Sequence, residues 1–140
     1  MRTLQLAVFL ALAMANATPA HASCTGADPS IVSAAVVNVT SANGLNTYRV
    51  SGRVRNVGPV KQTSSVLQFV GIYENDVRRD VRSVPPLKPN GVFTFTYDYA
   101  RSEAAGAGTT SLTLRLYFRH PVPPGREDCN LDNDSRTLEF

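Results

Sequence analysis

A period-two alternation of apolar and polar residues runs through most of the chain after residue 30, and it is clearest in residues 46–56. One side of that segment is apolar or small: Tyr48, Val50, Gly52 and Val54. The other side is polar and basic: Arg49, Ser51, Arg53 and Arg55. This pattern predicts a β-strand with one buried face and one solvated face. The turn residues that follow, 56–59, end the strand.

The same pattern predicts six further strands, separated by turn residues at near-regular spacing. They cover residues 31–40, 65–74, 77–84, 92–99, 110–119 and 136–140. The dipeptide Asn43-Gly44 predicts a hairpin between the first two strands. Since no segment shows a helical period, the sequence predicts an all-β fold, an immunoglobulin-like β-sandwich of about seven antiparallel strands.

Two of these strands carry more specific expectations. In residues 65–74 both alternating sets are apolar, and we expect Val70 and Ile72 to face the core rather than Phe69 and Tyr73. The strand over residues 77–84 is short and rich in charge, a property that protects sheet edges from adding another strand. We therefore expect that strand at an edge.

The first 22 residues have the features of a secretory signal peptide. Arg2 precedes an uncharged apolar run over residues 4–15, and Ala20-His21-Ala22 is a small-residue cleavage site. The run is shorter than the roughly 20 residues of a membrane-spanning helix. We expect a single domain over residues 23–140, secreted or periplasmic and with no membrane insertion after signal removal. Lipid attachment at Cys24 is the alternative, and His21 argues against it because such signals carry an aliphatic residue there.

The two cysteines, Cys24 and Cys129, lie near the two ends of the predicted mature domain. An oxidising compartment favours a disulfide between them. If the first and last strands lie side by side, both cysteines also fall at one end of the sandwich. The alternatives are that each cysteine is free or bridges another chain.

Four short motifs occur in the order and spacing of the bacterial cell-adhesion-related immunoglobulin-like domains known as CARDB. They are Val54-Arg55-Asn56-Val57-Gly58, Val70-Gly71-Ile72-Tyr73, Leu87-Lys88-Pro89-Asn90-Gly91 and Asn130-Leu131-Asp132-Asn133. The chain resembles this family over most of residues 31–140. It departs from the family where Glu74-Asn75-Asp76 replaces the usual Asp-Gly turn, and in its terminal cysteines. The resemblance implies a seven-stranded sandwich with an extracytoplasmic binding or spacer role, and it implies no catalytic residues.

Outward-facing arginines are one candidate binding site. They lie on two of the predicted strands, with one tyrosine between them: Arg49, Arg53, Arg55, Arg115, Tyr117 and Arg119. Guanidinium groups on adjacent strands can recognise carboxylates or phosphates through paired hydrogen bonds. The alternative is a solvated face without a ligand. A formal net charge of only +3 does not favour a nucleic-acid partner.

A second candidate is a calcium loop in the acidic segment that precedes the last strand. Asp128, Asn130, Asp132 and Glu139 fall at positions 1, 3, 5 and 12 of a calcium-loop spacing. Against it, position 6 is Asn133 rather than Gly, and Glu139 is needed in the last strand. The alternative is that Asn130, Asp132 and Asn133 bond the backbone of their own turn. No other cofactor is expected.

The sequence favours a non-catalytic function. The predicted mature domain has one histidine, His120, and the sequence shows no nucleophile–base pattern, phosphate loop or zinc-ligand cluster. We expect a binding or adhesion module whose partner is an extracytoplasmic protein or glycan. The alternative is an accessory subunit that joins a larger assembly by strand addition at residues 77–84.

Overall fold

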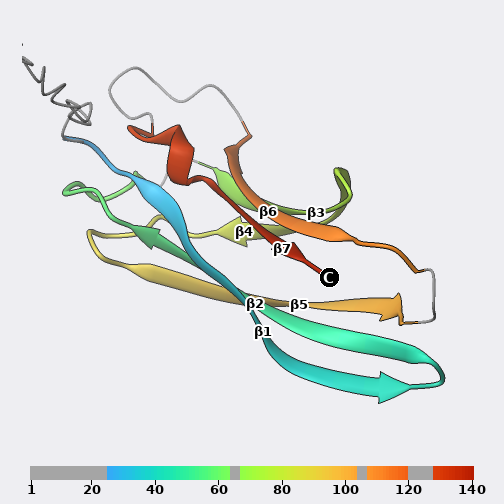
Figure 1. The fold of residues 1–140 in the computed structure, drawn as a ribbon. Coiled ribbons are helices and arrows are strands. Elements are labelled where there is room, and N and C mark those ends of the chain that lie inside the picture. Colours follow the sequence, from blue (N-terminus) through green and yellow to red (C-terminus); the bar gives the residue numbers. More distant parts are fainter. Residues whose placement is uncertain (1–24, 64–66, 104–106, 120–127) are drawn as a thin grey trace, which may run out of the picture.

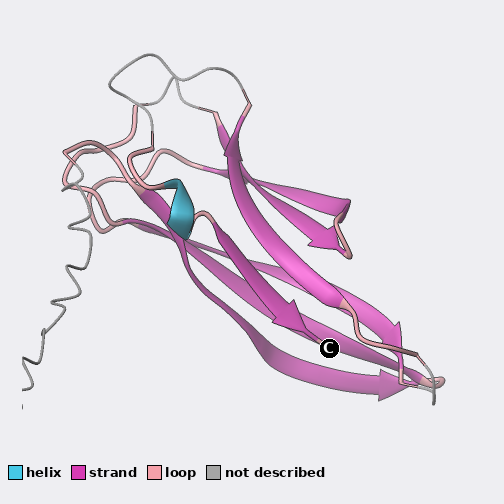
Figure 2. Cartoon of the chain, turned by 45° about the horizontal axis from the view of Figure 1, so that its top comes forward, coloured by secondary structure: helices cyan, strands magenta, loops and turns pink. Residues whose placement is uncertain are grey.

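The computed structural model describes residues 25–63, 67–103, 107–119 and 128–140. Within these ranges the chain forms seven β-strands and one short 3₁₀ helix (Figure 2). These elements are β1 (Pro29–Ala42), β2 (Leu45–Asn56), β3 (Gln68–Glu74), β4 (Val77–Val84), β5 (Val92–Ser102), β6 (Ser111–Phe118), η1 (Leu131–Asn133) and β7 (Ser135–Glu139). None of the described segments is a helix of the length and apolarity that a membrane crossing requires.

The strands form two antiparallel sheets that pack face to face (Figure 1). Sheet A has the order β1-β2-β5, and sheet B has the order β4-β3-β6-β7. The fold is an immunoglobulin-like β-sandwich, as the strand pattern predicted. β4 lies at an edge of sheet B, which confirms the expectation drawn from its charges.

The core lies between the sheets and follows the predicted alternation. In β2, Val50 and Val54 are buried, and in β3 the buried pair is Val70 and Ile72, as expected. Leucines of β6 complete the opposite wall: Leu112, Leu114 and Leu116. β5 contributes the buried rings of Phe95 and Tyr99. Each strand thus turns its apolar side towards the other sheet, where burial of apolar surface stabilises the fold.

Two hairpin turns use backbone conformations with positive φ. Asn43 and Gly44 connect β1 and β2 with φ values of 53° and 75°. Asn75 and Asp76 connect β3 and β4 with φ values of 45° and 64°. Two-residue hairpins favour this geometry because its twist matches that of the flanking strands, and Asn and Asp tolerate it better than most residues. The second turn therefore keeps a hairpin geometry without glycine.

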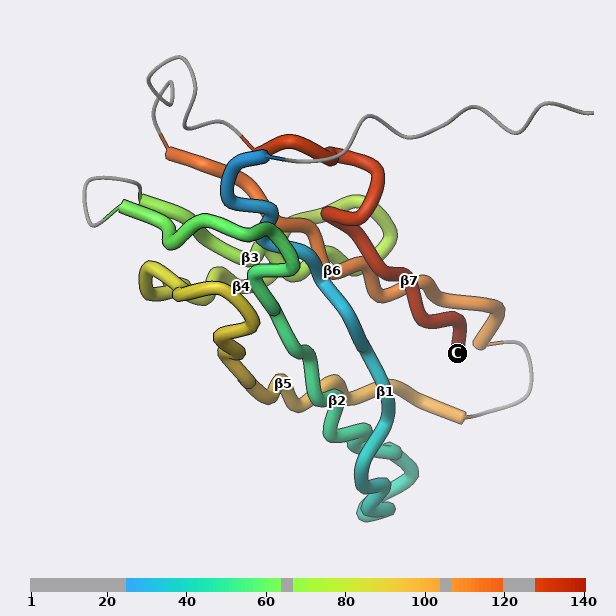
Figure 3. The backbone as a smooth tube through the Cα atoms, turned by 90° about the vertical axis from the view of Figure 1, so that its left-hand side faces the viewer, coloured from blue at the N-terminus to red at the C-terminus, as the bar shows by residue number. Residues whose placement is uncertain are grey.

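The two sheets differ in strand length. Sheet A has strands of 14, 12 and 11 residues, whereas the strands of sheet B have 8, 7, 8 and 5. The β1–β2 hairpin consequently extends past the strands of sheet B (Figure 3). We call residues 36–45 the hairpin overhang. The opposite end of the sandwich holds η1 and the start of β1, and we call it the η1 end.

Candidate binding surfaces

The arginines of β2 lie on the outer face of sheet A, and two of them already have polar partners. Arg49 donates to both carboxylate oxygens of Asp98 across the strand pair, at 2.7 and 2.8 Å. That hydrogen bond lowers the pKa of the Asp98 carboxyl below its ordinary value. Arg55 donates to Oδ1 of Asn90 at 2.6 Å, and Arg53 is exposed between them. On this face Asp98 therefore neutralises Arg49, while Arg53 and Arg55 keep their charges.

The outer face of sheet B is different, because aromatic rings lie on it. Phe69 of β3 and Tyr117 of β6 are paired across the strands, and their rings stack with centroids 5.7 Å apart. The same two rings, together with Arg78, Val81 and Arg119, line a shallow depression of about 320 Å³. Tyr117 was predicted to face outward, and the structure places it in this half-buried stack.

A second aromatic–arginine contact continues the same face. The Tyr73 ring folds over Gly71, where an added Cβ would lie 2.6 Å from ring atom Cε2. The Arg115 guanidinium lies 4.9 Å from the centre of that ring, in a cation–π arrangement. Its nearest carboxylate, Asp76, is 3.9 Å away and exposed. We call the six residues of this outer surface the aromatic–arginine face: Phe69, Tyr73, Arg78, Arg115, Tyr117 and Arg119.

The predicted basic stripe is thus divided between two surfaces, which corrects the expectation that its strands are adjacent. β2 belongs to sheet A and β6 to sheet B, and their polar faces point away from one another. Arg49, Arg53 and Arg55 lie on one side of the sandwich. Arg115, Tyr117 and Arg119 lie on the other, where the structure brings them together with aromatic residues of β3.

At the η1 end a buried asparagine joins three segments of the chain. Oδ1 of Asn56 accepts from the backbone N–H groups of Asp28 and Gly58, at 3.0 and 3.1 Å. Its Nδ2 donates to the carbonyls of Val60 and Leu87, at 2.8 and 3.0 Å. The approach is close, since a Cβ on Gly58 would lie 2.3 Å from the carbonyl oxygen of Gly26. The Val-x-Asn-x-Gly motif is therefore a structural junction that fixes the start of β1.

Beside this junction lies a group of acidic and amide side chains, which we call the polar cluster: Asp28, Asp128, Asn133 and Asp134. Nδ2 of Asn133 donates to Oδ1 of Asp28 at 3.0 Å, and the Ser30 hydroxyl donates to the carbonyl of Asn133 at 3.3 Å. Three buried oxygens of the cluster have no fixed hydrogen-bond donor: Asp128 Oδ2, Asn133 Oδ1 and Asp134 Oδ1. A proton held between the side chains of Asp128 and Asp134 supplies a hydrogen bond between them, so burial disfavours the fully ionised pair.

The electrostatics of the cluster follow from this burial. Burial raises the pKa of Asp134 to about 8, and the negative charge of Asp128 acts in the same direction. Burial also raises the pKa of Asp128 to about 6, although the backbone N–H of Asn130 opposes the shift. Because the two carboxyl groups interact, the two pKa values describe the titration of the pair rather than of either residue alone. Near neutral pH the pair therefore retains a proton that isolated carboxyls would have lost.

The predicted calcium ligands occupy different environments. Asp128 belongs to the polar cluster, but its Oδ1 accepts from the backbone N–H of Asn130 at 3.1 Å. Oδ1 of Asn130 accepts from the N–H of Asp132 at 3.2 Å and caps η1, while Asp132 and Glu139 are exposed. The described residues hold no group of three or more His, Cys, Asp or Glu arranged for a metal ion. The turn-bonding alternative is thus confirmed for Asn130, whereas the Asn133 side chain donates to Asp28 instead.

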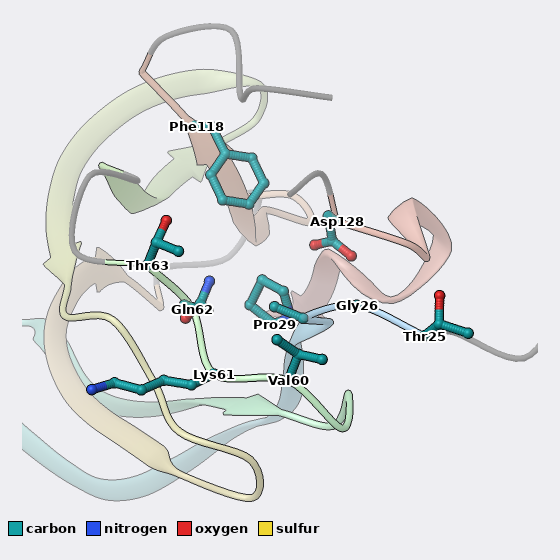
Figure 4. A pocket seen from close by; sticks show the side chains of 10 residues that line it. Thr25, Gly26, Pro29, Val60, Lys61, Gln62, Thr63, Phe118 and Asp128 are labelled. Carbon is teal, nitrogen blue, oxygen red and sulfur yellow. The ribbon is translucent and has the colours of Figure 1, made fainter. Parts of the chain in front are cut away.

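A cavity of about 240 Å³ opens beside the polar cluster (Figure 4). Apolar atoms of Pro29, Val60 and Phe118 form part of its wall, and Lys61 and Gln62 lie along one side. Gln62 is held by paired side-chain hydrogen bonds with Gln68, at 2.7 and 3.1 Å. Asp128 also lines this cavity. One carboxyl group of the polar cluster is therefore adjacent to open space.

The cysteines and the signal segment are only partly covered by the structure. Cys24, His120 and residues 1–22 lie outside the described residues, so the disulfide and the signal peptide stay predictions. Sγ of Cys129 lies 3.3 Å from the carbonyl oxygen of Ala27, three residues after Cys24 in the sequence. This placement puts Cys129 close to the segment in which its expected partner lies.

Several residues of the polar cluster and of the aromatic–arginine face were not identified from the sequence. Asp28, Asn133 and Asp134 were not identified as a group, because Asp28 is more than 100 residues from the other two. Phe69, Tyr73 and Arg78 were not assigned to a surface. For Phe69 and Tyr73 a signal existed, since the preference for Val70 and Ile72 inside already placed these rings outside.

Comparison with known proteins yields matches among solved structures. No family model matches the chain, and no curated protein sequence matches it. The CARDB domain of a Pyrococcus furiosus protein, solved in complex with di-metal ions, matches with a TM-score of 0.59 at 17% identity, over 84% of this chain and 94% of that domain. A domain of a proposed cell surface protein from Methanosarcina acetivorans matches with a TM-score of 0.51 at 19% identity, over 81% and 90%. At such identities the similarity concerns the fold.

Proposed function

We propose that this CARDB-like sandwich is a non-catalytic extracytoplasmic binding module, which contacts another component of the cell envelope or surface through its aromatic–arginine face. The observation that carries the proposal is the stacked pair Phe69 and Tyr117 beside Arg78 and Arg119 on the outer surface of sheet B. Both similar domains come from proteins whose names point to adhesion-related or surface modules.

The chemistry of the face suits an acidic partner. Tyrosine and arginine are enriched among the residues that dominate binding energy at protein interfaces. The two stacked rings are held against one another, so ordering them on binding costs little. Arg115 has only a distant, exposed carboxylate near it, whereas Arg49 on the opposite face is already paired with Asp98. Arg115 is therefore more available to an acidic partner than Arg49.

The test is a crosslinking pull-down from envelope extract, with the exported protein as bait. Tyr117→Ala combined with Arg119→Glu should abolish capture, because it removes one ring of the stack and reverses a charge at its rim. The matched control is Arg53→Glu with Arg55→Glu on sheet A, which makes a larger charge change on the other face and should leave capture intact. Melting temperatures establish that both variants are folded.

The proposal fails if the folded protein captures nothing, or if only the sheet A variant loses capture. The second outcome would assign binding to the outer face of sheet A. A partner retained by both variants would contradict a role for either surface. A soluble anionic glycan that competes for capture would identify a glycan as the ligand class and leave the proposed face unchanged.

A second candidate function is divalent cation binding at the polar cluster. The three buried oxygens without a fixed donor belong to two carboxyl groups and one amide, and once the shared proton is displaced, oxygen ligands of this kind suit calcium or magnesium. The similar Pyrococcus domain was solved with di-metal ions. A bound cation would compensate the charges of Asp128 and Asp134, which burial otherwise disfavours. The remaining coordination positions would be filled by water.

This candidate is tested by thermal melts in EDTA and in millimolar calcium or magnesium. A cation that binds the folded state alone raises the melting temperature in proportion to its saturation. Asp134→Asn should remove the increase, while the control Asp132→Asn, an exposed aspartate outside the cluster, should keep it. Identical melts with and without the cation would dismiss the site.

A further inference from the structure

β1 forms an edge of sheet A, and it lacks the protection that the other edges of the sandwich carry. No residue of Pro29–Ala42 is charged. The edge strands β4, β5 and β7 all contain charged residues: Arg78, Arg79, Asp80 and Arg82 in β4, Asp98 and Arg101 in β5, and Arg136 and Glu139 in β7. Charges at an edge oppose the addition of another strand. Among the described edge strands, β1 alone carries no charge that would oppose the addition of another strand.

The exposed part of β1 lies in the hairpin overhang. Val36, Val37 and Val39 expose 39%, 59% and 46% of their surface. Val36 pairs with Val50 and Val39 with Tyr48, two residues that point into the sandwich. Both valines therefore lie on the inner side of sheet A, and their side chains are exposed there. They belong to the hairpin overhang, which extends past the strands of sheet B (Figure 3). An uncharged edge here coincides with exposed apolar side chains.

The backbone of this segment is regular enough to receive a strand. Register irregularities occur between Ile31 and Ser33 and between Val36 and Asn38. From Asn38 to Ala42, β1 pairs with β2 without a further shift. Five residues in extended conformation span roughly 17 Å, close to a common strand length. Strand addition is therefore expected over residues 38–42 rather than along the whole of β1.

We propose that a second copy of this chain occupies this edge, with residues 38–42 of the two copies paired antiparallel about a two-fold axis near Thr40. Such pairing places each Thr40 against its counterpart, Val39 against Ser41 and Asn38 against Ala42, so that no like charges meet. Self-pairing of β4 would instead bring arginines together. The joined sheet, in the order β5-β2-β1-β1-β2-β5, has six strands, which is within the usual size range. This interface is independent of the aromatic–arginine face.

The test is sedimentation equilibrium of the exported protein between about 1 and about 500 µM. We expect a reversible monomer–dimer equilibrium that Thr40→Lys weakens at least tenfold, because the two introduced charges would oppose one another across the axis. The matched control is Val77→Lys on edge strand β4, since Val77 is also exposed, at 53%. It should leave the equilibrium unchanged. Melting curves verify that each variant is folded.

Amide hydrogen exchange supplies a second readout, because the backbone amides of residues 38–42 that face the open edge should exchange more slowly as protein concentration rises. A monomer over the whole concentration range would overturn the proposal. A dimer weakened equally by both variants, or one without concentration-dependent protection at residues 38–42, would also overturn it. Capture of an envelope partner by a strictly monomeric protein would leave the proposed function intact while refuting this dimer.

Discussion

At the scale of single residues, Asn56 shows how one polar side chain can organise the end of a β-sandwich. Its oxygen accepts two hydrogen bonds and its nitrogen donates two, all with backbone groups: two in the loop that follows Asn56 and two in distant segments of the chain. The side chain is completely buried. A hydrophobic residue of similar size would leave all four backbone groups without this partner, and at least some of them lie away from water. The asparagine is therefore required by the loops around it.

We expect Asn56→Ala to lower the free energy of unfolding by at least about 3 kcal/mol, because buried donors and acceptors would lose their partner together. Urea denaturation of the purified protein measures the change. Thr94→Ala, at an exposed position of β5, is the control and should change stability by no more than about 0.5 kcal/mol. Equal effects of the two substitutions would contradict the role assigned to Asn56.

The carboxyl pair at the polar cluster predicts an unusual dependence of stability on pH. Asp128 and Asp134 have raised pKa values in the folded state, about 6 and about 8, against an ordinary value of 3.8. The folded state therefore holds protons that the unfolded chain has lost. The contribution of the pair to stability is complete below pH 3.8 and is lost as pH rises through about 6 and about 8.

In EDTA, the melting temperature should consequently be lower at pH 8 than at pH 5. Asp134→Asn should flatten this part of the profile, because an amide does not titrate, while Asp132→Asn should leave it as in the original protein. A profile that rises from pH 5 to pH 8 would contradict the raised pKa values.

The sequence predicted the burial of individual residues well and their polar contacts poorly. Val50, Val54, Val70 and Ile72 could be placed because burial follows from alternation within one strand. The bond between Asn133 and Asp28 could not, because it depends on where two distant segments of the chain meet. The motif around Asn56 carries a family resemblance in the sequence, but two of the four hydrogen bonds depend on where the distant segments of Asp28 and Leu87 lie.

At the scale of elements, the sequence predicted the number and the faces of the strands but not which strands are neighbours. β2 pairs with β5, and β3 pairs with β6, across long stretches of sequence. The arginines of β2 and β6 were therefore grouped together although they lie on opposite faces. Strand ends also differ by a few residues, for example in β5, which continues to Ser102 because it pairs with Leu45 there.

The face of β3 offers a test at this scale. Gly71→Ala would place a Cβ 2.6 Å from Cε2 and 3.0 Å from the hydroxyl oxygen of Tyr73. The flexible ring can move aside, so we expect a loss of only about 1 kcal/mol in unfolding free energy, together with loss of the Arg115 contact. Changes in the NMR signals of the Tyr73 ring measure this displacement.

Ser83→Ala, an exposed position on the same outer face of β4, is the control for Gly71→Ala. It should leave both stability and the Tyr73 ring signals as they are. An unmoved ring in Gly71→Ala would show that the backbone, rather than the side chain, accommodates the added methyl group.

At the scale of the whole molecule, the first and last parts of the domain meet at the η1 end. Ser30 bonds the carbonyl of Asn133, and Cys129 lies beside Ala27. A disulfide between Cys24 and Cys129 would link these two parts of the domain covalently. It would enclose the 104 residues between the two cysteines. Loops of that size correspond to a stabilisation of about 4–5 kcal/mol in the chain-entropy model, as an upper figure.

We therefore expect the oxidised protein to be more stable than the reduced one, and Cys129→Ser to resemble the reduced form. Urea denaturation with and without a thiol reductant measures the difference, and the mass of a proteolytic fragment that joins both cysteines establishes the bond. Two free thiols in the exported protein would refute the pairing.

The position of β7 has a mechanical consequence. With Cys24 and Cys129 joined, strands β1 to β6 all lie inside the covalent loop, and only η1 and β7 lie outside it. Tension applied between residue 24 and Phe140 would then pass through the disulfide and load only the last 11 residues. Stretching them yields roughly 40 Å, against roughly 400 Å for the reduced chain. Under tension the protein would therefore lose only the short C-terminal strand β7, while strands β1 to β6 stayed folded inside the covalent loop.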